Sequence, residues 1–380
     1  MKDTCYEIAN RKLQHFIDNH ILRYEKERNY DLGVGNRNNV SNLSMFISHR
    51  IITEYQIIDK VLKKYKLNQV EKYVQEVFWR VYWKGWLENR PKVWSDFTKD
   101  CFNIKPNLGY EKAVNAKTNI NCFNEWVSEL VKHNYLHNHT RMWFASIWIF
   151  TLKLPWQLGA KFFYEHLFDG DSASNTLSWR WVAGLQTKGK NYLAKSWNIQ
   201  KFTNNRFHDE NLNEFAEPIE DFREYKVQEN FVEKISSKIN TDLIIFENDL
   251  FIKDRYEFFK SYKNIYLLLL NNENRQLPLS QKVYNFKKSL CYDFSNEIPN
   301  CNFVDFTNES FFENLKEIDV IYPFIGENLD FLKKVSKEKS IKLNFIFREE
   351  DKYCQQFSKK GFFNFKSNIG NIIDFLGFNN

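Results

Sequence analysis

The chain has 380 residues, more than one hydrophobic core usually holds, so two domains are expected. Its 54 Lys and Arg and 48 Asp and Glu give a net charge of +6, of which residues 1–210 carry +10 and the remainder −4. The six Cys lack metal-ligand spacing, no apolar run has the length of a membrane span, and the N-terminal segment MKDTCYEIAN lacks the apolar stretch of a signal peptide. These features exclude zinc, iron–sulfur and membrane proteins. We expect a cytoplasmic monomer without a metal.

A helical domain is predicted for residues 1–205. Residues 45–85, 121–136 and 141–168 have apolar positions at helical spacing and few helix breakers. All eleven Trp and all eight His lie before residue 211. A basic, aromatic domain suits nucleic acid, because phosphates attract Lys and Arg while bases stack on flat rings. A general amino-acid bias of the source organism would produce the same excess of Lys.

The remaining residues predict a domain of a different class. A polar, acidic connector is expected at 206–238, followed by an α/β domain at 239–380. Short apolar runs separated by segments of helix length are typical of a parallel sheet with helical crossovers. Five such runs are present: TDLIIF (241–246), NIYLLLL (264–270), NFVDF (302–306), DVIYPFI (319–325) and KLNFIF (342–347). The predicted fold class is therefore an all-α domain followed by a Rossmann-like α/β domain with a five-stranded parallel sheet, which has no Gly-rich phosphate loop of its own.

Two segments of the helical domain carry charged groups where burial is expected. LFDGDSASNTLSWRW (167–181) contains Asp169 and Asp171, which acidic capping of a helix N-terminus alone would explain. YLHNHTRMWFASIWIF (135–150) places Arg141 near the start of an otherwise apolar helix. A buried guanidinium needs an anion, which Asp169 or Asp171 could supply. A structural ion pair accounts for this much, and a ligand site requires further evidence.

Five ordered motifs resemble those of the FAD-binding domain of DNA photolyases and cryptochromes. YEKER (24–28) resembles the family's Tyr-containing entry segment, VSNLS (40–44) its TSxLS loop, QEVFWRVYW (75–83) its ELIWREFY helix, LHNHTRM (136–142) its MHNRxRM motif and DGDSASNTLSWRW (169–181) its DGDxAxNxxxWxW motif. The resemblance implies the same helical fold and FAD as cofactor. The implied contacts to the FAD pyrophosphate are Ser41, Leu43, Ser44 and Tyr24. At the isoalloxazine edge they are Asp169, Gly170 and Asp171, with Arg141 bridging to Asp169. Asn175 is implied to face the flavin N5.

The resemblance also implies an electron-transfer chain and a substrate. Trp179 and Trp156 match the first two members of the family's chain of Trp residues, and Trp94 or Trp86 is the candidate for the third. The expected partner is UV-damaged DNA carrying a cyclobutane pyrimidine dimer, flipped out of the stack. The residues that match its pocket are Glu76, Trp79, Asn138, Met142 and Trp181, of which all but Trp79 are the expected catalytic residues, with Arg80 and His139 as further DNA contacts. Glu76 lies on an aromatic helix expected to be buried, where a carboxylate without a role is costly.

The sequence departs from the family in its motifs and in its domain order. His139 stands where dimer-repairing members have Arg, and Val40 replaces the loop Thr. In the family an α/β antenna domain precedes the helical domain, whereas here DLIIFENDLFIKD (242–254), which resembles the start of that domain, follows it. This order suggests a circular permutation, and an unrelated α/β appendage would give the same order. No motif decides whether this part holds an antenna chromophore.

The expected function is a light-dependent deoxyribodipyrimidine photolyase, a carbon–carbon lyase that splits the dimer by electron transfer from excited FADH⁻. One alternative is a cryptochrome-like blue-light photoreceptor, which needs the Trp chain but not Glu76, Met142 and Trp181 together. Another is a photoenzyme of this fold with a different substrate. The last alternative is a helical protein that binds no flavin, whose five motifs would match those of the family by coincidence.

Overall fold

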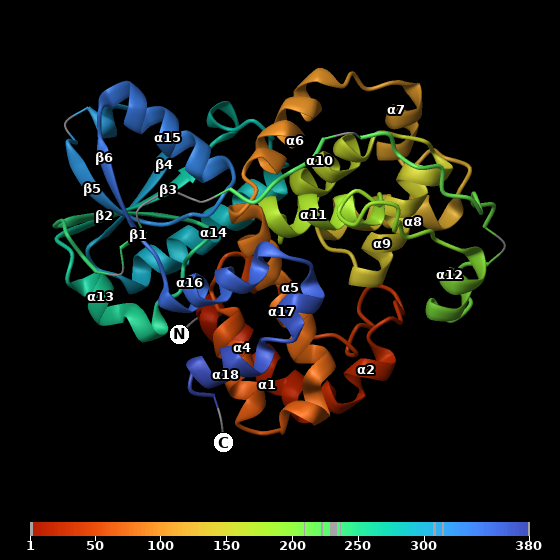
Figure 1. The fold of residues 1–380 in the computed structure, drawn as a ribbon, viewed down its shortest axis with the longest axis horizontal. Helices are drawn as coiled ribbons and strands as arrows, with labels where there is room; N and C mark the ends of the chain where they lie inside the picture. The colour runs from red at the N-terminus through yellow and green to blue at the C-terminus, as the bar shows by residue number, and fades with distance from the viewer. Residues whose placement is uncertain are drawn as a thin grey trace.

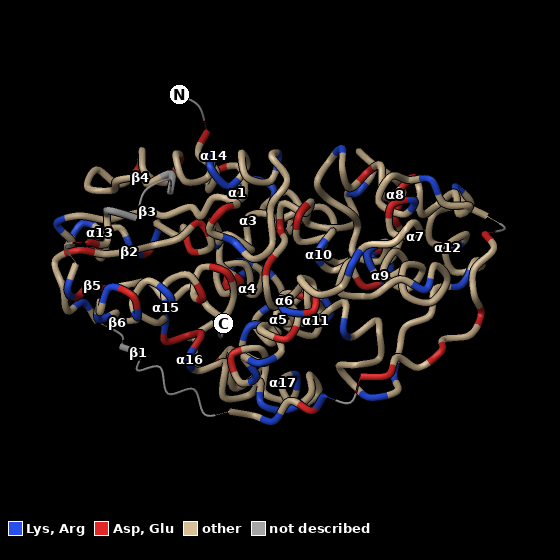
Figure 2. The backbone as a smooth tube through the Cα atoms, turned by 90° about the horizontal axis from the view of Figure 1, so that it is seen from above, with Lys and Arg blue, Asp and Glu red and all other residues tan. Residues whose placement is uncertain are grey.

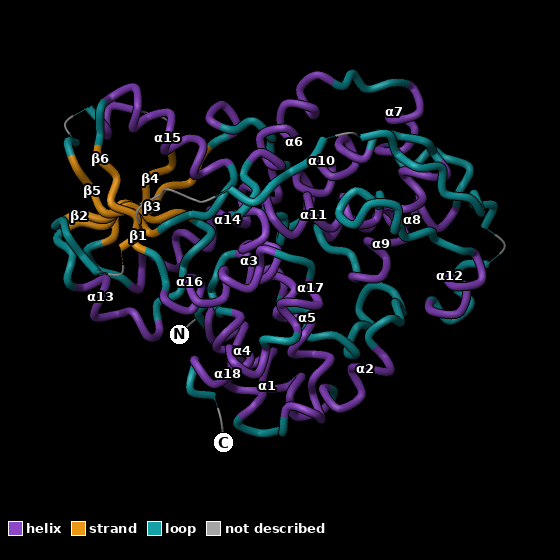
Figure 3. Tube along the Cα trace, viewed as in Figure 1, coloured by secondary structure: helices purple, strands orange, loops and turns teal. Residues whose placement is uncertain are grey.

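The computed structural model describes residues 3–378 except 209, 222, 229–233, 236, 307–308 and 314. The chain forms a helical part and a part built around a parallel sheet, which lie side by side (Figures 1 and 3). The predicted fold class is confirmed. The predicted connector, 206–238, lies partly outside the described residues.

The helical part is assembled around one long central helix, α5 (Leu67–Glu88), whose 22 residues include a buried apolar face. Helices α2, α4 and α11 pack directly against it. The helices of this part are α1 (Cys5–Asn19), α2 (Tyr24–Glu27), α3 (Ser44–Ser48), α4 (Glu54–Leu62), α5, α6 (Lys92–Asn103), α7 (Leu108–Val114), α8 (Asn121–His133), α9 (Asn138–Ser146) with the π-helical turn η2 (Ile147–Thr151), α10 (Trp156–His166), α11 (Ser172–Val182) and α12 (Ser196–Phe202).

All strands of the sheet are parallel, in the order β1-β6-β5-β2-β3-β4. The strands are β1 (Lys234–Ile235), β2 (Asp242–Phe246), β3 (Asn264–Leu270), β4 (Cys301–Phe306), β5 (Glu317–Ile321) and β6 (Lys342–Ile346), and the longer helices between them are α14 (Gln281–Glu297) and α15 (Glu327–Lys339). After the short edge strand β1, the chain enters the centre of the sheet with β2, moves outward to β4, and returns to β5 on the other side of β2, which is a doubly wound order. The five predicted strands are confirmed, and the two-residue β1 adds a sixth at the edge.

The helical part docks against the carboxyl ends of β2 and β5, the position at which a doubly wound sheet reverses its order. Glu88 of α5 accepts hydrogen bonds from Tyr322 Oη and the backbone N of Ile325, both at 2.8 Å. Open α/β sheets usually bind ligands at this crevice. Here a cavity of about 40 Å³ is left between the two parts, lined by residues that include Lys84 and Phe324, which is room for about one water molecule.

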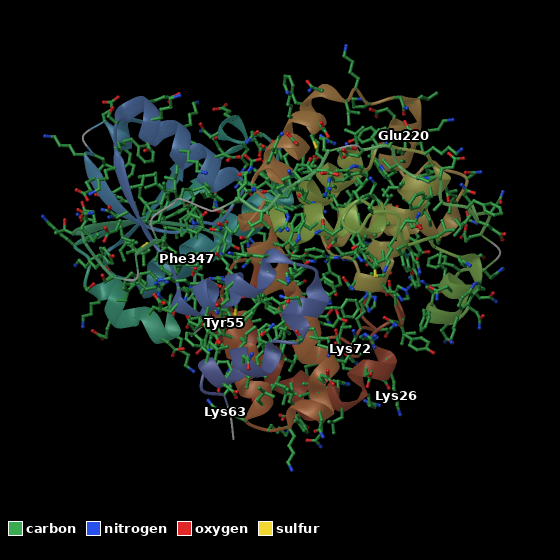
Figure 4. The ribbon with its side chains drawn as sticks, viewed as in Figure 1. Lys26, Tyr55, Lys63, Lys72, Glu220 and Phe347 are labelled. Atoms are coloured by element: carbon green, nitrogen blue, oxygen red, sulfur yellow. The ribbon has the colours of Figure 1, made fainter. Side chains whose placement is uncertain are left out.

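A buried ion pair fixes the same interface. Arg50, which follows α3, donates two hydrogen bonds to Asp351 at 2.6 and 2.7 Å. The Tyr55 hydroxyl on α4 donates to the same carboxylate at 2.8 Å, at the boundary between the two parts (Figure 4). Because burial disfavours an isolated charge, the pairing of Arg50 with Asp351 fixes α16 on the helical part, and Asp249, which follows β2 and lies 3.4 Å from Arg50 Nη1, connects the sheet to the same guanidinium.

The last helices of the chain pack on the helical part rather than on the sheet. They are α16 (Glu349–Gln355), α17 (Phe362–Lys366) and α18 (Ile369–Phe375). Both α16 and α17 contact α5, and Figure 1 shows all three beside α1, α4 and α5. The C-terminal end of the chain is thereby brought close to residues near its start.

Charge is mixed over the molecule, with basic and acidic positions interspersed along both parts (Figure 2). Among the described residues, no helix combines the length and the apolar character that a bilayer crossing requires. Within the same residues, His, Cys, Asp and Glu side chains form no group of three or more arranged to hold a metal ion.

Candidate functional site

An ion pair between α9 and the loop before α11 lies at the centre of the candidate site. Arg141 Nη1 is 3.0 Å from Asp169 Oδ2, and Arg141 Nε donates to the carbonyl of Leu136 at 2.9 Å. Burial alone would raise the pKa of Asp169, but the charges of Arg141 and Arg80 outweigh it and hold the pKa below its ordinary value. Of the two carboxylates that the sequence offers to Arg141, Asp169 is the partner.

Asp171 serves a different purpose. Its Oδ1 accepts from the backbone N of Ala173 at 2.9 Å and of Ser174 at 2.7 Å, so it is the N-cap of α11. Its Oδ2 accepts from Arg80 Nη1 at 2.7 Å. Helix capping, which the sequence analysis gave as the simplest reason for an acidic residue here, is therefore present at Asp171. Through Arg80, Asp171 also holds the start of α11 against α5.

Several buried polar atoms of the candidate motifs have no hydrogen-bond partner within the described residues. They are both carboxylate oxygens of Asp169, which approach Arg141 and Ser44 without good hydrogen-bond alignment, and Ser44 Oγ, Ser174 Oγ and Trp179 Nε1. Buried polar groups in proteins are nearly always paired, so these atoms are open to a further polar ligand, as are unpaired buried atoms elsewhere in the chain such as Trp126 Nε1 and Asn248 Oδ1. A flavin dinucleotide could pair with all the atoms of the candidate motifs, because its ring N–H groups donate to carboxylate oxygens, and its carbonyl and phosphate oxygens accept from hydroxyl and indole N–H groups.

Asn175 is held on α11 by one hydrogen bond. Its Nδ2 donates to the carbonyl of Ala160 on α10 at 2.7 Å. The side chain is buried, and this bond fixes its orientation with the amide oxygen directed away from Ala160. An anchored amide suits contact with a flavin N5, which carries a proton in the reduced cofactor and none in the oxidised one.

The residues predicted for the pyrophosphate lie next to one another. Tyr24 and Tyr73 meet at right angles with ring centroids 5.1 Å apart. Burial raises the pKa of Tyr73 to about 12, against the opposite effect of the neighbouring Ser41 hydroxyl. Ser44, three residues further along, lowers the pKa of Asp169. Contacts through Tyr73 and through the loop with Ser41 and Ser44 therefore connect Tyr24 with Asp169.

A buried ion cluster that sequence reasoning missed supports this loop. Arg37 donates to Asp31 at 2.9 and 3.1 Å and to Glu129 of α8 at 2.6 Å, and Thr140 of α9 donates to Asp31 at 2.5 Å. Despite burial, the Arg37 guanidinium lowers the pKa of Asp31 to about 2. The cluster joins the segment before Ser41 to α8 and α9. The only sequence signal is the concentration of charged and polar residues in DLGVGNRNN.

The five residues predicted to form the lesion pocket share one property, since each has a side chain that is at least partly accessible to solvent. They are Glu76, Trp79, Asn138, Met142 and Trp181. They come from α5, α9 and α11, the helices that also carry Tyr73, Arg141 and Trp179. Of the predicted FAD contacts, Arg141 and Asn175 lie on two of these helices, α9 and α11.

The expectation that Glu76 is buried is wrong. Its side chain is 29% exposed, and its carboxylate lies 2.7 Å from Lys72 Nζ and 3.9 Å from Arg28 Nε. Lys72 lies near α2 on the outer side of the molecule (Figure 4). Helical spacing on α5 indicates an apolar face but not where that face ends, and Glu76 lies beyond its edge.

One face of Trp79 is already covered. Phe362 of α17 stacks on it with centroids 3.6 Å apart and the planes inclined by 12°. The carbonyl of Lys360 accepts a hydrogen bond from Tyr82 Oη at 3.0 Å, which holds the start of α17 against α5. A base that stacks on Trp79 must therefore use the other face or displace Phe362.

His139, predicted as a DNA contact, is a core residue instead. Its ring stacks on Trp143 at 4.1 Å, and its two nitrogens lie 2.9 Å from the carbonyl of Asn29 and 3.1 Å from Tyr192 Oη. Burial lowers its pKa, which favours the neutral ring. A neutral, buried imidazole with both nitrogens engaged does not replace the Arg of the family motif.

The predicted chain of Trp residues is only partly assembled. Trp156 stacks on Phe97 at 5.5 Å, and Phe97 lies 5.8 Å from Trp94. Trp94 is 1% exposed and donates through Nε1 to Asp330 at 2.8 Å. Trp94 therefore does not provide the surface end that the prediction needs, because it is buried and separated from Trp156 by a Phe. Trp86, the other candidate, is also buried, beneath Arg90.

Comparisons with known proteins agree with the motifs. A family model described as the FAD binding domain of DNA photolyase matches residues 73–234. The deoxyribodipyrimidine photo-lyase of Neurospora crassa is 28% identical over 206 residues, which cover 49% of this chain and 31% of that protein. The chain spans 31% to 40% of the length of three such curated photo-lyases.

Two solved structures show a partial likeness. A bacterial class III photolyase from Agrobacterium tumefaciens is 26% identical with a TM-score of 0.45, covering 52% of this chain and 42% of that one. A Synechocystis cryptochrome is 18% identical with a TM-score of 0.46, covering 52% and 43%. The matched segment and the ordered motifs support an FAD-binding domain of the photolyase and cryptochrome type around residues 73–234.

Proposed function

We propose that this chain is a light-driven DNA repair enzyme, a deoxyribodipyrimidine photolyase that splits cyclobutane pyrimidine dimers. The observation that carries the proposal is the Arg141–Asp169 pair, whose buried carboxylate lies just before α11 and whose guanidinium lies on α9, two helices with accessible side chains of the matching lesion pocket. Met142 follows Arg141 on α9, and Trp181 lies two residues beyond Trp179 on α11. These sequence positions support a cofactor site and a substrate site on neighbouring residues.

Bound FAD, when reduced and excited by blue or near-UV light, supplies one electron to the dimer and recovers it after the ring opens. In this proposal, Tyr24, Ser41, Leu43 and Ser44 bind the pyrophosphate, while Arg141, Asp169, Gly170, Asp171 and Asn175 orient the flavin. Glu76 and Asn138 meet the base edges of the flipped dimer. Trp181 and Met142 pack against it and exclude water. These residues provide binding and electrostatics, so the reaction needs neither a nucleophile nor a metal.

We further infer that residues 1–205 form the FAD-binding domain and that residues 239–380 form an antenna-type domain displaced by circular permutation, with 206–238 as the connector. Two features support this division. The segment that resembles the start of the antenna domain contains β2, which follows the two-residue β1 and is the first long strand of the sheet. The helical part also docks against the carboxyl edge of that sheet through Glu88.

A cryptochrome-like photoreceptor is the second candidate, and one observation favours it. Phe362 stacks on Trp79, where a repair enzyme needs an aromatic face free for the lesion. In a photoreceptor this contact would be permanent, or would change with the redox state of the cofactor instead of with DNA.

Repair and photoreception are separated by one experiment. The protein is loaded with FAD, reduced, and illuminated with an oligonucleotide that contains a thymine dimer, and loss of the dimer is followed by chromatography against a dark control. The proposal predicts catalytic, light-dependent loss. Normal photoreduction of the flavin without loss of the dimer would exclude repair and favour the photoreceptor.

A further inference from the structure

Trp179 has an aromatic neighbour that the sequence motifs do not indicate. The ring of Trp148 lies 6.2 Å from that of Trp179 at an angle of 87°, and the ring of Tyr110 lies 5.7 Å from that of Trp148 at 85°. Trp148 and Trp179 are buried, whereas Tyr110 on α7 is partly accessible. Three oxidisable rings in edge-to-face contact therefore lead from the flavin site to the surface.

The backbone of α10 packs closely against the rings of Trp179 and Trp148. A Cβ on Gly159 of α10 would overlap the Trp179 ring and would lie 3.0 Å from Trp148 Cε2, so only Gly lets α10 approach both indoles. Trp148 belongs to the π-helical turn η2, and its Nε1 donates to the carbonyl of Pro155 at 2.9 Å. Such turns are rare and are often found at functional sites. Backbone and side chain together fix Trp148 against Trp179.

The route through Trp156 is less direct. The ring that stacks on Trp156 is Phe97, and beyond it lies the buried Trp94. The benzene ring of Phe is far harder to oxidise than an indole or a phenol. A positive charge on Trp156 would therefore have no oxidisable neighbour in that direction.

We propose that Trp148 and Tyr110 carry electrons from the protein surface to Trp179 during photoreduction of the cofactor. The proposal rests on the proposed function, because it requires a light-excited flavin beside Trp179. Trp179 gives one electron to the cofactor and takes one from Trp148, and Trp148 takes one from Tyr110. Tyr110 loses its phenolic proton to water, and a thiol in solution returns one electron and one proton to the resulting tyrosyl radical. Each cycle thus moves one electron from the thiol to the cofactor.

The surroundings of Tyr110 suit this role. Burial and the negative charges of Glu165 and Glu111 raise its pKa to about 12, so the resting side chain is the neutral phenol at physiological pH. The same negative charges stabilise the positive charge that develops on the ring during oxidation. Its partial exposure gives the departing proton a path to solvent and gives the thiol access to the ring.

Two variants and one matched control test the route in the FAD-loaded protein. Trp148→Phe and Tyr110→Phe interrupt it at different points, and Trp126→Phe removes another fully buried Trp, which stacks on Trp143. FAD absorbance first verifies that each variant holds the cofactor. Light-driven flavin reduction is then measured with a thiol and without DNA. We expect it to be lost in Trp148→Phe and strongly slowed in Tyr110→Phe, and retained in Trp126→Phe.

A second readout identifies the radical itself. Electron paramagnetic resonance on protein with ring-deuterated Tyr should show a light-induced tyrosyl signal that narrows on labelling and is absent from Tyr110→Phe. The route would be overturned if the flavin of Trp148→Phe were photoreduced as fast as that of Trp126→Phe. It would also be overturned if the radical signal did not change on deuteration of Tyr.

The failure of the route is distinguishable from the failure of the proposed function. Repair by chemically reduced FAD does not need these residues, so a protein that repairs dimers but is not photoreduced overturns only the route. A protein whose photoreduction depends on Trp148 but which repairs nothing leaves the route in place and excludes repair.

Discussion

Replacing Arg37 by Met should destabilise the helical part strongly, because it leaves two carboxylates with only Arg206, which lies 3.9 Å from Asp31, as a nearby cation. Arg37 is 7% exposed and makes two hydrogen bonds to Asp31, which is fully buried, and one to Glu129, which is nearly so. Breaking a buried pair from one side costs about 3–5 kcal/mol. For a domain of this size, that loss corresponds to a fall in melting temperature of roughly 10 °C.

The effect should depend on pH in a stated direction. In the parent the pKa of Asp31 is about 2, below its ordinary value of 3.8, so Asp31 contributes stability above pH 3.8 that is lost as the pH falls through 2. In Arg37→Met the uncompensated carboxylates titrate above their ordinary pKa values, so the variant gains stability relative to the parent as the pH falls. Thermal unfolding followed by Trp fluorescence at pH 8 and pH 5 measures this difference.

The matched control is Arg11→Met, which removes an exposed ion pair with Asp3 and should change little. If Arg37→Met melts within about 2 °C of Arg11→Met at pH 8, the cluster does not stabilise the loop as inferred from its burial.

Three further predictions concern the site. Asp169→Asn should weaken FAD binding at least tenfold by fluorescence titration, because charge-assisted hydrogen bonds are worth about 1.5–3 kcal/mol, and unchanged affinity would remove Asp169 from the site. Trp181→Ala should lower dimer repair while FAD binding persists, and Trp197→Ala, at a 60% exposed position on α12, should repair normally; equal repair by both would contradict the pocket. Phe362→Ala should tighten binding of dimer-containing DNA in a gel-shift assay, because it uncovers the face of Trp79 on which Phe362 stacks. The control is Phe363→Ala at the neighbouring position, which is 88% exposed. Equal binding by the two variants would show that Phe362 does not block the DNA site.

The sequence predicted what local pattern and burial encode. Continuous apolar runs such as NIYLLLL marked the five main strands, because a strand covered on both faces must be apolar throughout. The two-residue β1 left no such signal, since it exists only through its pairing with β6. The packing of α17 on α5 was equally invisible, because it joins residues nearly three hundred positions apart.

The candidate site shows the same division. Arg141 was matched to a carboxylate because a buried guanidinium requires one, and the structure supplies Asp169. Glu76 was misjudged although Lys72 stands four residues before it on the same helix, a spacing typical of an exposed ion pair. His139 could not be assigned from its own neighbours, because Asn29 and Tyr192 reach it from distant segments.

A structure of the FAD-loaded protein would test the central claim most directly. The account predicts that the flavin lies against Asp169 and Asn175 and the pyrophosphate near Ser41 and Ser44. FAD bound elsewhere, for example in the 790 Å³ groove beside Trp156, with Asp169 and Arg141 making no contact to it, would contradict the account.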